Sequence, residues 1–458
     1  MSSLFGSLAI ATGALGADQG AMDATTNNVA NANTPGYSRL VPVLVQSDPV
    51  VIGNVTYGEG VVLQQLRSVR DPILQLRIEN ETQQQGQLNT VVSAMQQAQV
   101  QFTSSSSDIG SEISNLFSSL NQLSTDPTNA SLRQSVLAAA GNLSTVFNNT
   151  SNALSQQRTN LDLNVSQTVQ QVNTLSAQIA GLNTKISQLE GVGQDASAFE
   201  DQRDVAIGQL SNLIGVSTIQ SDNSLTLTTG NGSPLVVGGQ SFNLSTQSNA
   251  SGFQDVYSQG QDITSKLTSG ELGGLVQVRD QTIPGVISNL DTLASGLANA
   301  MNAANAKGFD LYGNPGGNIF VPPSGTGQGY AATMAVAITD PSLIAASSDG
   351  TQGSNGNIAV LTAVENQNVA GGQTPTDYYS NIVANVGNDV ANATAELSST
   401  QLALNQLQDQ LGSVSGVSLD EEAANMVQYQ RAYDAAANVV TTINDMIYTA
   451  INMSTLTV

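Results

Sequence analysis

Apolar residues recur with heptad spacing in four long segments of this 458-residue chain, and two of these segments lie at its ends. The clearest pattern runs from Leu161 to Leu189, and a similar one runs from Val390 to Val414. Heptad spacing returns apolar side chains to one helix face, which a partner must cover. Two such helices readily lie side by side in a bundle. The chain is therefore expected to be mainly α, with an elongated helical bundle that shorter helices at 116–123 and 132–146 join.

The N-terminal segment carries the first terminal seam. Its four glycines before residue 21 each lower helix stability by about 1 kcal/mol relative to alanine, so the helix needs a partner. The helix is expected to end before Pro35-Gly36, because proline disfavours helix at the preceding residue and glycine permits a positive φ. The apolar members of this seam are Leu4, Leu8, Ala11, Leu15, Met22 and Val29.

A matching seam runs almost to the last residue. Ser418 and Glu421 form a capping box, and further acids in the first turn suit the helix dipole. Either terminal seam alone is more often an ordinary core helix than a coiled coil, but two low-charge seams at opposite ends favour antiparallel pairing with each other. The candidate assembly seam comprises Leu4, Leu8, Leu15, Met22, Val29, Tyr37, Met426, Tyr429, Tyr433, Val440, Ile443 and Ile447. Its tyrosines are equally compatible with core packing and with anchoring a neighbouring subunit.

Residues 216–268 have a different character. Ser224 to Thr229 alternates with period two, and Gly230-Asn231-Gly232 separates it from another apolar run, as in a β-hairpin. This segment is expected to be a small outer β-rich domain inserted into the bundle. The expected domains are a terminal coiled coil with its connector (1–59 with 415–458), the helical bundle (60–215 with 269–414) and the β-rich insertion (216–268).

Composition excludes most catalytic chemistry. The chain has no Cys, no His and no Trp, so Ser–His and Cys–His catalysis and the usual thiolate and imidazole metal sites are impossible. A pair of carboxylates is the one catalytic option left. A net charge of −23 disfavours nucleic acid and anionic lipid as partners, because both require basic patches. No cofactor, no metal and no enzymatic activity are expected.

Three charged or glycine-rich segments are expected to be structural. Arg203 between Asp201 and Asp204 is typical of an ion pair that supports a bundle. The segment 349–357 lacks the spacing and the closing Glu of a calcium loop. The segment 313–317 has residues typical of a turn and lacks the lysine of a phosphate-binding loop.

No apolar run long enough to span a membrane is present, and the first 38 residues contain no basic residue, so no secretory signal of the usual kind is expected. Export by another route is expected instead.

The segment from Asn28 to Arg39 resembles the N-terminal signature of the flagellar rod, hook and hook-associated axial proteins. The matching motif residues are Asn31, Asn33, Thr34, Pro35, Gly36, Tyr37, Ser38 and Arg39. The stretch from Ser418 to Met453 is similar to the C-terminal motif of the same superfamily. The resemblance implies that the terminal helices pair as the axial domain of a tube, and that they are disordered before export and fold on assembly.

Five internal segments are similar, in the same order, to the hook-associated protein 1 family within that superfamily: 199–204, 210–216, 270–275, 308–317 and 340–347. This resemblance implies a structural adaptor, secreted by the flagellar type III route, that joins hook to filament outside the cell. The implied partners are the hook protein, the next hook-associated protein on the filament side, further copies of the chain in a ring and a cytoplasmic export chaperone.

Two alternatives and one remote possibility remain open. A hook or distal rod protein shares both terminal signatures, although the long coil from Leu161 to Leu189 argues against it. A secreted adhesin fits the acidic, Thr- and Asn-rich β segments but gives the terminal seams no purpose. A flagellum-associated glycosidase needs facing acids and aromatic sugar platforms, and a chain without Trp, with aromatic residues at 4%, scarcely provides the platforms.

Overall fold

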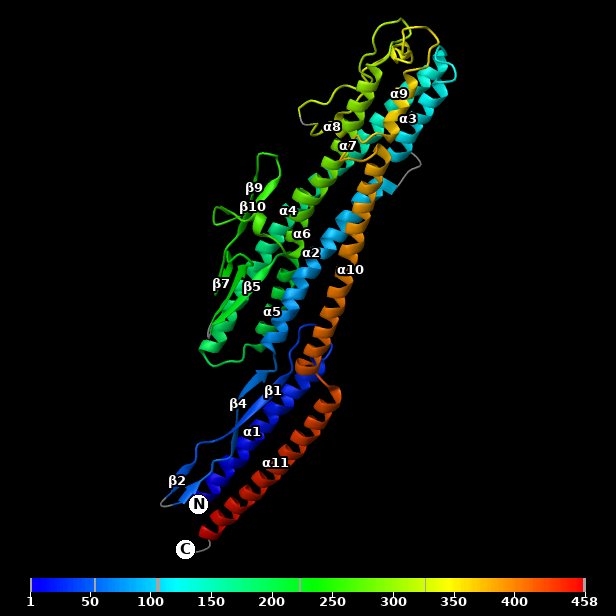
Figure 1. Cartoon of the computed structure of the whole chain (residues 1–458). Helices are drawn as coiled ribbons and strands as arrows, with labels where there is room; N and C mark the ends of the chain where they lie inside the picture. Colours follow the sequence, from blue (N-terminus) through cyan, green and yellow to red (C-terminus); the bar gives the residue numbers. More distant parts are fainter. Residues whose placement is uncertain (1, 53–54, 104–107, 222–223, 326, 456–458) are drawn as a thin grey trace.

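Long helices run side by side along most of the molecule and give it the shape of a rod (Figure 1). The computed structural model describes residues 2–52, 55–103, 108–221, 224–325 and 327–455. The longest helix, α4, has 62 residues and therefore spans about 93 Å. The longer bundle helices are α2 (Pro72–Thr103), α4 (Ala130–Gly191), α7 (Ile283–Asn305) and α10 (Pro375–Ser415). The shorter ones are α3 (Ile109–Leu123), α5 (Ser197–Leu213), α6 (Gly270–Gln277), α8 (Tyr330–Thr333) and α9 (Ile358–Ala363).

The bundle is mainly α, as the heptad patterns indicate. The heptad positions from Leu161 to Leu189 face inward, and most of them are buried, whereas Leu163, which lies off the heptad stripe, is exposed. The separate short helix expected at 132–146 is instead the first part of α4, because no Gly or Pro interrupts the chain strongly enough to end the helix before Gly191. Asn129 caps this helix by accepting hydrogen bonds from two backbone amides of its first turn.

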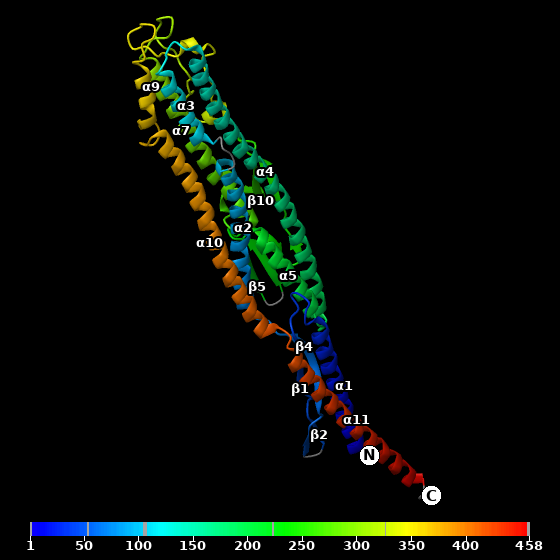
Figure 2. The ribbon, with the colours of Figure 1, turned by 90° about the vertical axis from the view of Figure 1, so that its right-hand side faces the viewer.

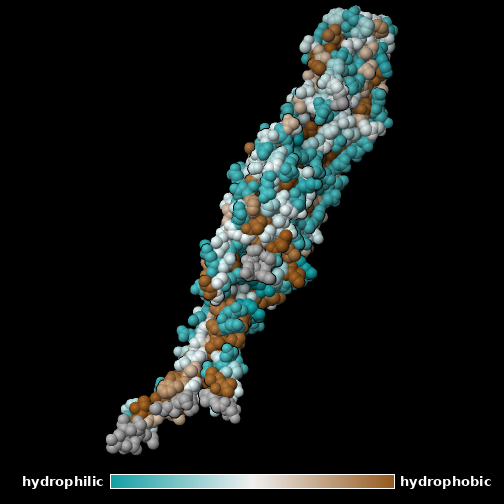
Figure 3. All heavy atoms as spheres, turned by 90° about the vertical axis from the view of Figure 1, so that its left-hand side faces the viewer, coloured by the Kyte–Doolittle hydropathy of each residue, from teal (hydrophilic) through white to brown (hydrophobic). Residues whose placement is uncertain are grey.

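The two chain ends lie together at the narrow end of the rod, as two views at right angles show (Figures 1 and 2). Helices α1 (Ser2–Asn31) and α11 (Leu419–Thr455) run antiparallel and form what we call the terminal coil. Strands β1 (Leu40–Gln46) and β4 (Val61–Ser68) pair antiparallel against α1, and we call this pair the ribbon. Its outer end carries the short pair β2 (Val50–Ile52) and β3 (Val55–Tyr57). Figure 3 shows hydrophobic side chains exposed on this narrow end.

The β-rich insertion lies along one side of the bundle. Its first sheet has the order β5-β6-β7-β8 and its second has the order β11-β10-β9, all antiparallel. The strands are β5 (Val216–Ser221), β6 (Ser224–Thr229), β7 (Pro234–Val237), β8 (Gln240–Ser241), β9 (Leu244–Ser248), β10 (Gln254–Ser258) and β11 (Gln261–Asp262). Apolar residues such as Leu227 and Val236 are buried and continue the core of the bundle. Asn173 of α4 exchanges two hydrogen bonds of 2.8 Å with the backbone of Leu244.

Loops cover most of the far end of the rod, between α7 and α9 (Figure 1). Arg133 of α4 organises them, because its buried guanidinium donates to the carbonyl oxygens of Pro127 (2.6 Å) and Ile344 (2.8 Å). Short 3-10 turns at Thr264–Lys266, Pro341–Leu343 and Val364–Asn366 connect the neighbouring elements.

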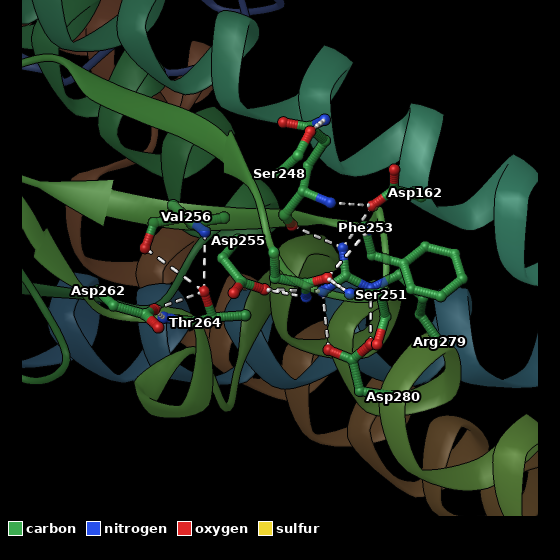
Figure 4. A network of polar contacts seen from close by, with 12 residues as sticks. Asp162, Ser248, Ser251, Phe253, Asp255, Val256, Asp262, Thr264, Arg279 and Asp280 are labelled. Carbon is green, nitrogen blue, oxygen red and sulfur yellow. Dashed lines mark hydrogen bonds and ion pairs between the residues drawn. The ribbon is translucent and has the colours of Figure 1, made fainter.

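Arg279 fastens the insertion to the bundle. It lies in a π-helical turn, Val278–Thr282, and its side chain is fully buried. Its guanidinium donates to Asp162 Oδ1 of α4 (2.6 Å), to the carbonyl oxygen of Gln254 in β10 (2.7 Å) and to the carboxylate of Asp280 (2.8 and 2.7 Å) (Figure 4). The ring of Phe253 lies beside it, with its centre 5.7 Å from Arg279 Cζ. One side chain thus holds three separate segments together.

Replacing Arg279 by Met should lower the free energy of unfolding by about 3 kcal/mol, because it leaves the carboxylates of Asp162 and Asp280 without their partner. Denaturation in urea, followed by circular dichroism, measures this loss. Lys266→Met is the matched control, since Lys266 is an exposed cation in the same insertion and its loss should change stability by less than about 0.5 kcal/mol. Equal stabilities of the two variants would contradict the prediction.

Candidate assembly interface

The seam predicted on α11 faces α1. Every seam residue of this helix is at least half covered, and Ile443 is buried. The opposite face of α11 is uncovered along its length, with Val427, Val439 and Met446 about half exposed. The heptad spacing therefore identifies the inner face of α11, and the structure brings Met426, Tyr429, Tyr433, Val440, Ile443 and Ile447 together along it.

On α1 the predicted seam is covered much as on α11, apart from Val29, but most of the fully buried side chains lie beside it. Leu4, Leu8, Leu15 and Met22 are only partly covered, and Val29 is 42% exposed. Small residues occupy the buried stripe: Ala11, Ala17, Ala21, Ala24 and Thr25, followed by Asn28. The reason is crowding, because α1 contacts both α11 and the ribbon. A Cβ at Gly20, for example, would overlap the Leu63 side chain of β4.

A tight turn follows α1 and contains the family motif. The amide of Tyr37 donates to the carbonyl oxygen of Thr34 (3.1 Å), and Pro35 and Gly36 occupy the two central positions. Gly36 has a φ of +79°, which a type II turn requires and which side chains oppose. A Cβ at this position would also overlap the Val205 side chain of α5. The motif glycine therefore serves both the turn and the close approach to the bundle.

Asn28 connects the end of α1 to α11 and to the ribbon. Its Oδ1 accepts from the Tyr37 hydroxyl and from the Leu40 amide, both at 2.8 Å. Its Nδ2 donates to the Leu40 carbonyl oxygen (2.8 Å) and to Glu422 Oε2 (3.1 Å). All the hydrogen-bonding capacity of this amide is used, although the side chain is only 1% exposed.

Arg39 completes this group from the other side. Its Nε donates to Glu422 Oε1 (2.7 Å), its Nη1 pairs with Glu421 (2.8 Å), and its backbone amide donates to the Ser415 carbonyl oxygen (3.0 Å). We call Asn28, Tyr37, Arg39 and Glu422 the Asn28 latch. Burial, with nearby carboxylates adding to it, raises the pKa of Tyr37 to about 12, so its hydroxyl keeps its proton and stays a donor.

A second group of charges ties the turn to the bundle. Arg70, just before α2, pairs with Asp201 (2.6 Å) and Glu200 (2.8 Å) of α5. Asp201 also accepts from the Ser38 amide (3.1 Å). The acids of α5 are thus part of an ion-pair network, but their main cation is Arg70, while Arg203 lies 3.9 Å from Asp204. Sequence spacing could not identify Arg70, because it lies more than a hundred positions before its partners. We call this region, where the terminal coil meets the bundle, the neck.

An open groove of about 900 Å³ lies at the neck between α2, α5 and the end of α10. Glu79 lies on its α2 side and is 5% exposed. Burial raises the pKa of Glu79 to about 7, against an opposing hydrogen bond from Thr218 (3.1 Å), and the charge of Asp204 raises it further. In the part of the chain that the structure describes, no cluster of acids is arranged to hold a metal ion. Nor is any described helix long and apolar enough to cross a membrane.

Three family models match the chain. The one described as the flagellar hook-associated protein FlgK helical domain matches residues 95–320. Those described as flagella basal body rod protein and as flagellar basal body rod FlgEFG protein C-terminal match residues 8–37 and 411–453. The two rod models therefore fall on the helices of the terminal coil, and the helical-domain model falls on the bundle and its insertion.

Relatives extend over nearly the whole chain. Flagellar hook-associated protein 1 of Bacillus subtilis is 29% identical, with 99% of each chain covered. The protein of the same description from Salmonella typhimurium is 26% identical, over 96% of this chain and 98% of the relative. The solved structure of the flagellar hook junction protein FlgK from Burkholderia pseudomallei has a similar fold, with a TM-score of 0.66 at 19% identity, over 74% of this chain and all of the other.

The antiparallel terminal coil, its motif turn and the long bundle define a structural protein of the bacterial flagellum, of the rod, hook and hook-associated class. Within that class, the chain belongs to the family of flagellar hook-associated protein 1, or FlgK. Its relatives are structural components of an extracellular organelle, and the chain is a structural protein and not an enzyme.

Replacing Glu422 by Ala should open the terminal coil, because the buried amide of Asn28 and the Nε of Arg39 both lose their acceptor. The local free energy of opening α11 should fall by about 2 kcal/mol. Hydrogen exchange of the α1 and α11 amides measures it. Glu421→Ala is the matched control: it removes another carboxylate from Arg39, but that carboxylate is 62% exposed and should matter little. Equal exchange in the two variants would refute the role of the Asn28 latch.

Replacing Glu79 by Gln should stabilise the protein in alkaline solution. The pKa of Glu79 is about 7 in the folded state against 4.5 ordinarily. The free energy of unfolding of the natural chain therefore falls as the pH rises from 4.5 through 7. At pH 8 the free energy of unfolding of the variant should exceed that of the natural chain by up to about 3 kcal/mol, and at pH 4 the two values should agree.

Urea denaturation at pH 4, 6 and 8 tests this dependence. Asp409→Asn in α10 is the control, because Asp409 is exposed and its replacement should shift stability by less than about 0.5 kcal/mol at each pH. A difference between Glu79→Gln and the natural chain that stays constant with pH would contradict the prediction.

Proposed function

We propose that this protein joins the flagellar hook to the filament, with the terminal coil as its axial assembly element. The observation that carries the proposal is the uncovered outer face of α11. Tyr448 is 71% exposed and Ile451 is 50% exposed, while Phe5 at the start of α1 is 57% exposed. Apolar side chains concentrated at one end of a molecule mark a surface that a partner covers (Figure 3).

Three units carry separate tasks in this proposal. Residues 1–59 with 415–458 form the axial unit, which stacks with hook subunits on one side and with the next hook-associated protein on the other. Residues 60–215 with 269–414 form the bundle, which contacts copies of the chain in a ring. Residues 216–268 form the outer unit. Residues 1, 53–54, 104–107, 222–223, 326 and 456–458 in these ranges lie outside the described residues.

The seam and motif residues have distinct roles in the proposal. The seam side chains of α11 pair the two ends of the chain, while the motif from Asn31 to Arg39 fixes the angle at which the pair meets the bundle. Support for the second role comes from the contacts of Gly36 with α5 and of Arg39 with α11. A fixed angle is what a junction needs if it is to hold a filament in line with a hook.

The terminal coil is proposed to gain its full stability only on assembly. Among the described residues of α11, only Glu422 and Ile443 are buried, so α11 covers little apolar surface within one molecule. A chain with weakly held ends suits export through the flagellar type III channel, guarded in the cytoplasm by a chaperone that binds near the C-terminus. The position at the hook–filament junction outside the cell follows from the same proposal.

Deleting residues 421–458 should leave a soluble, helical bundle that cannot join hook to filament. Cells that make only the truncated chain should carry hooks without filaments and release filament subunits into the medium. Electron microscopy of the cells and immunoblotting of the medium measure both effects. As a control, the full-length chain with Val192→Ser, which alters an exposed apolar residue of the bundle, should support normal filaments.

Normal filaments on cells with the truncated chain would refute the proposal. Immunogold labelling of the full-length chain should form a narrow band just beyond the hook. Label along the whole hook would instead favour a role as hook or distal rod protein, the class whose models match the two terminal helices.

A further inference from the structure

One face of the ribbon points away from α1, the helix against which the ribbon packs. The Leu63 side chain lies on the α1 side, where it would overlap a Cβ at Gly20, and its cross-strand partner Leu44 shares that side. Side chains alternate along a strand, so the positions next to Leu44 point away from α1. This outer face of the ribbon consists of three cross-strand pairs: Val41 with Arg67, Val43 with Gln65 and Val45 with Val62.

Arg67 is the one charged residue on the outer face of the ribbon. Its side chain is exposed, and it takes part in none of the ion pairs among the described residues. Val62 on the same strand is 41% exposed. Strands β1 and β4 contain no acid. The ribbon thus presents an apolar face with a single cation whose charge is unused within the molecule.

The outer face of α11 carries the opposite charge. Three acids, Asp420, Asp434 and Asp445, lie there with one cation, Arg431, and all four are exposed. Each is about 140° or more around the helix from Tyr429, which faces α1. The net charge of this face is therefore negative, and the molecule has two uncovered faces of unlike charge at its narrow end.

We propose that the outer face of the ribbon of one copy packs on the outer face of α11 of the next copy, and that Arg67 pairs with Asp420 across this contact. The inference rests on the proposed function, because it requires copies arranged around a tube. Copies related by a rotation about the tube axis meet through two different surfaces. The two outer faces meet this condition, since α1 lies between the ribbon and α11 and the faces point in different directions (Figure 1).

Arg67 and Asp420 lie at nearly the same height along the rod. Asn28 gives the reference level, because it is hydrogen-bonded both to Leu40 of β1 and to Glu422 of α11. Arg67 is paired one position beyond Leu40, and Asp420 lies two residues before Glu422, so each is about 3 Å from this level. Copies at similar heights therefore bring the two side chains together. The other two acids of the face lie at least about 21 Å further along α11.

Charge decides which faces can meet. Two ribbon faces would place cation against cation, and two α11 faces would bring together surfaces of net negative charge. Only the ribbon with α11 joins unlike charges, and no register of β1 and β4 places an acid against the acids of α11. Val62 then meets the region of Val427, which is 47% exposed. Enclosure between these side chains makes the ion pair harder to replace by water than a pair on an open surface.

The first test uses cells that lack their own copy of the gene and produce the Arg67→Glu chain. The number of filaments per cell should fall about tenfold, because an acid then faces Asp420 in every contact, while secretion and helical content stay unchanged. Combining Arg67→Glu with Asp420→Arg should restore at least half of the filaments. Lys307→Glu is the matched control, because it makes the same charge change at an exposed site in the bundle and should leave filaments unchanged. Normal filament numbers with Arg67→Glu, or no restoration by Asp420→Arg, would overturn the inference.

Thiol cross-linking locates the contact with all charges in their natural state. The chain has no Cys, so Val62→Cys combined with Val427→Cys introduces the only two thiols. Because α1 separates the two sites within one molecule, a link between them joins two copies. A short bis-maleimide applied to isolated flagella should give dimers and a ladder of larger products, since every copy presents both faces. Either single variant should give monomers alone. Dimers from a single variant, or no product from the double variant, would overturn the inference.

The same cells separate this inference from the proposed function. Filaments on cells that lack the protein altogether would refute the function itself. Filaments that are lost without the protein and fully restored by the Arg67→Glu chain would refute only the contact between ribbon and α11.

Discussion

The fold at the narrow end of this protein depends on one buried hydrogen-bonded group, the Asn28 latch. Asn28 and Glu422 are 394 positions apart in the chain and both are almost fully buried, so neither could remain there without the other. Arg39 neutralises the Glu422 carboxylate, and Tyr37 satisfies the remaining lone pair of Asn28. The latch therefore fixes three features together: the end of α1, the start of α11 and the position of the ribbon against both helices. Apolar packing alone would leave these three free to shift by a helical turn.

Sequence periodicity predicts the helices and the insertion well, because both depend on a repeating choice between apolar and polar residues. The inner face of α11 and the seam of α4 were located from heptad spacing alone. The small residues buried beside the predicted seam of α1 were not located, since they depend on how much room α11 and the ribbon leave between them. Where a helix is enclosed on two sides, alanine and glycine occupy the tightest positions and leucine moves to the margins.

The polar contacts of the neck were harder to predict for a related reason. An ion pair such as Arg70 with Asp201 has no periodic signature, and its partners become neighbours only after the bundle forms. The segment from Asn31 to Arg39 resembles a known signature, and this resemblance identified the right segment. It did not explain the physical role of the residues in it. The structure supplies that role for Gly36, which must be small and of positive φ, and for Arg39, which must reach a buried carboxylate. Asn33 is exposed, and nothing in the structure explains its place in the motif.

The chain crosses the neck covalently at two points, between β4 and α2 and between α10 and α11. Two peptide connections side by side resist torsion as a single linker does not, because rotation of the coil about the long axis of the rod must stretch one connection or bend it around the other. The backbone amides of Ser38 and Arg39 also donate hydrogen bonds to Asp201 of α5 and to Ser415 of α10, so the coil is held to the bundle by more than its two peptide connections. A twist applied to the narrow end is therefore passed to the bundle with little lost rotation.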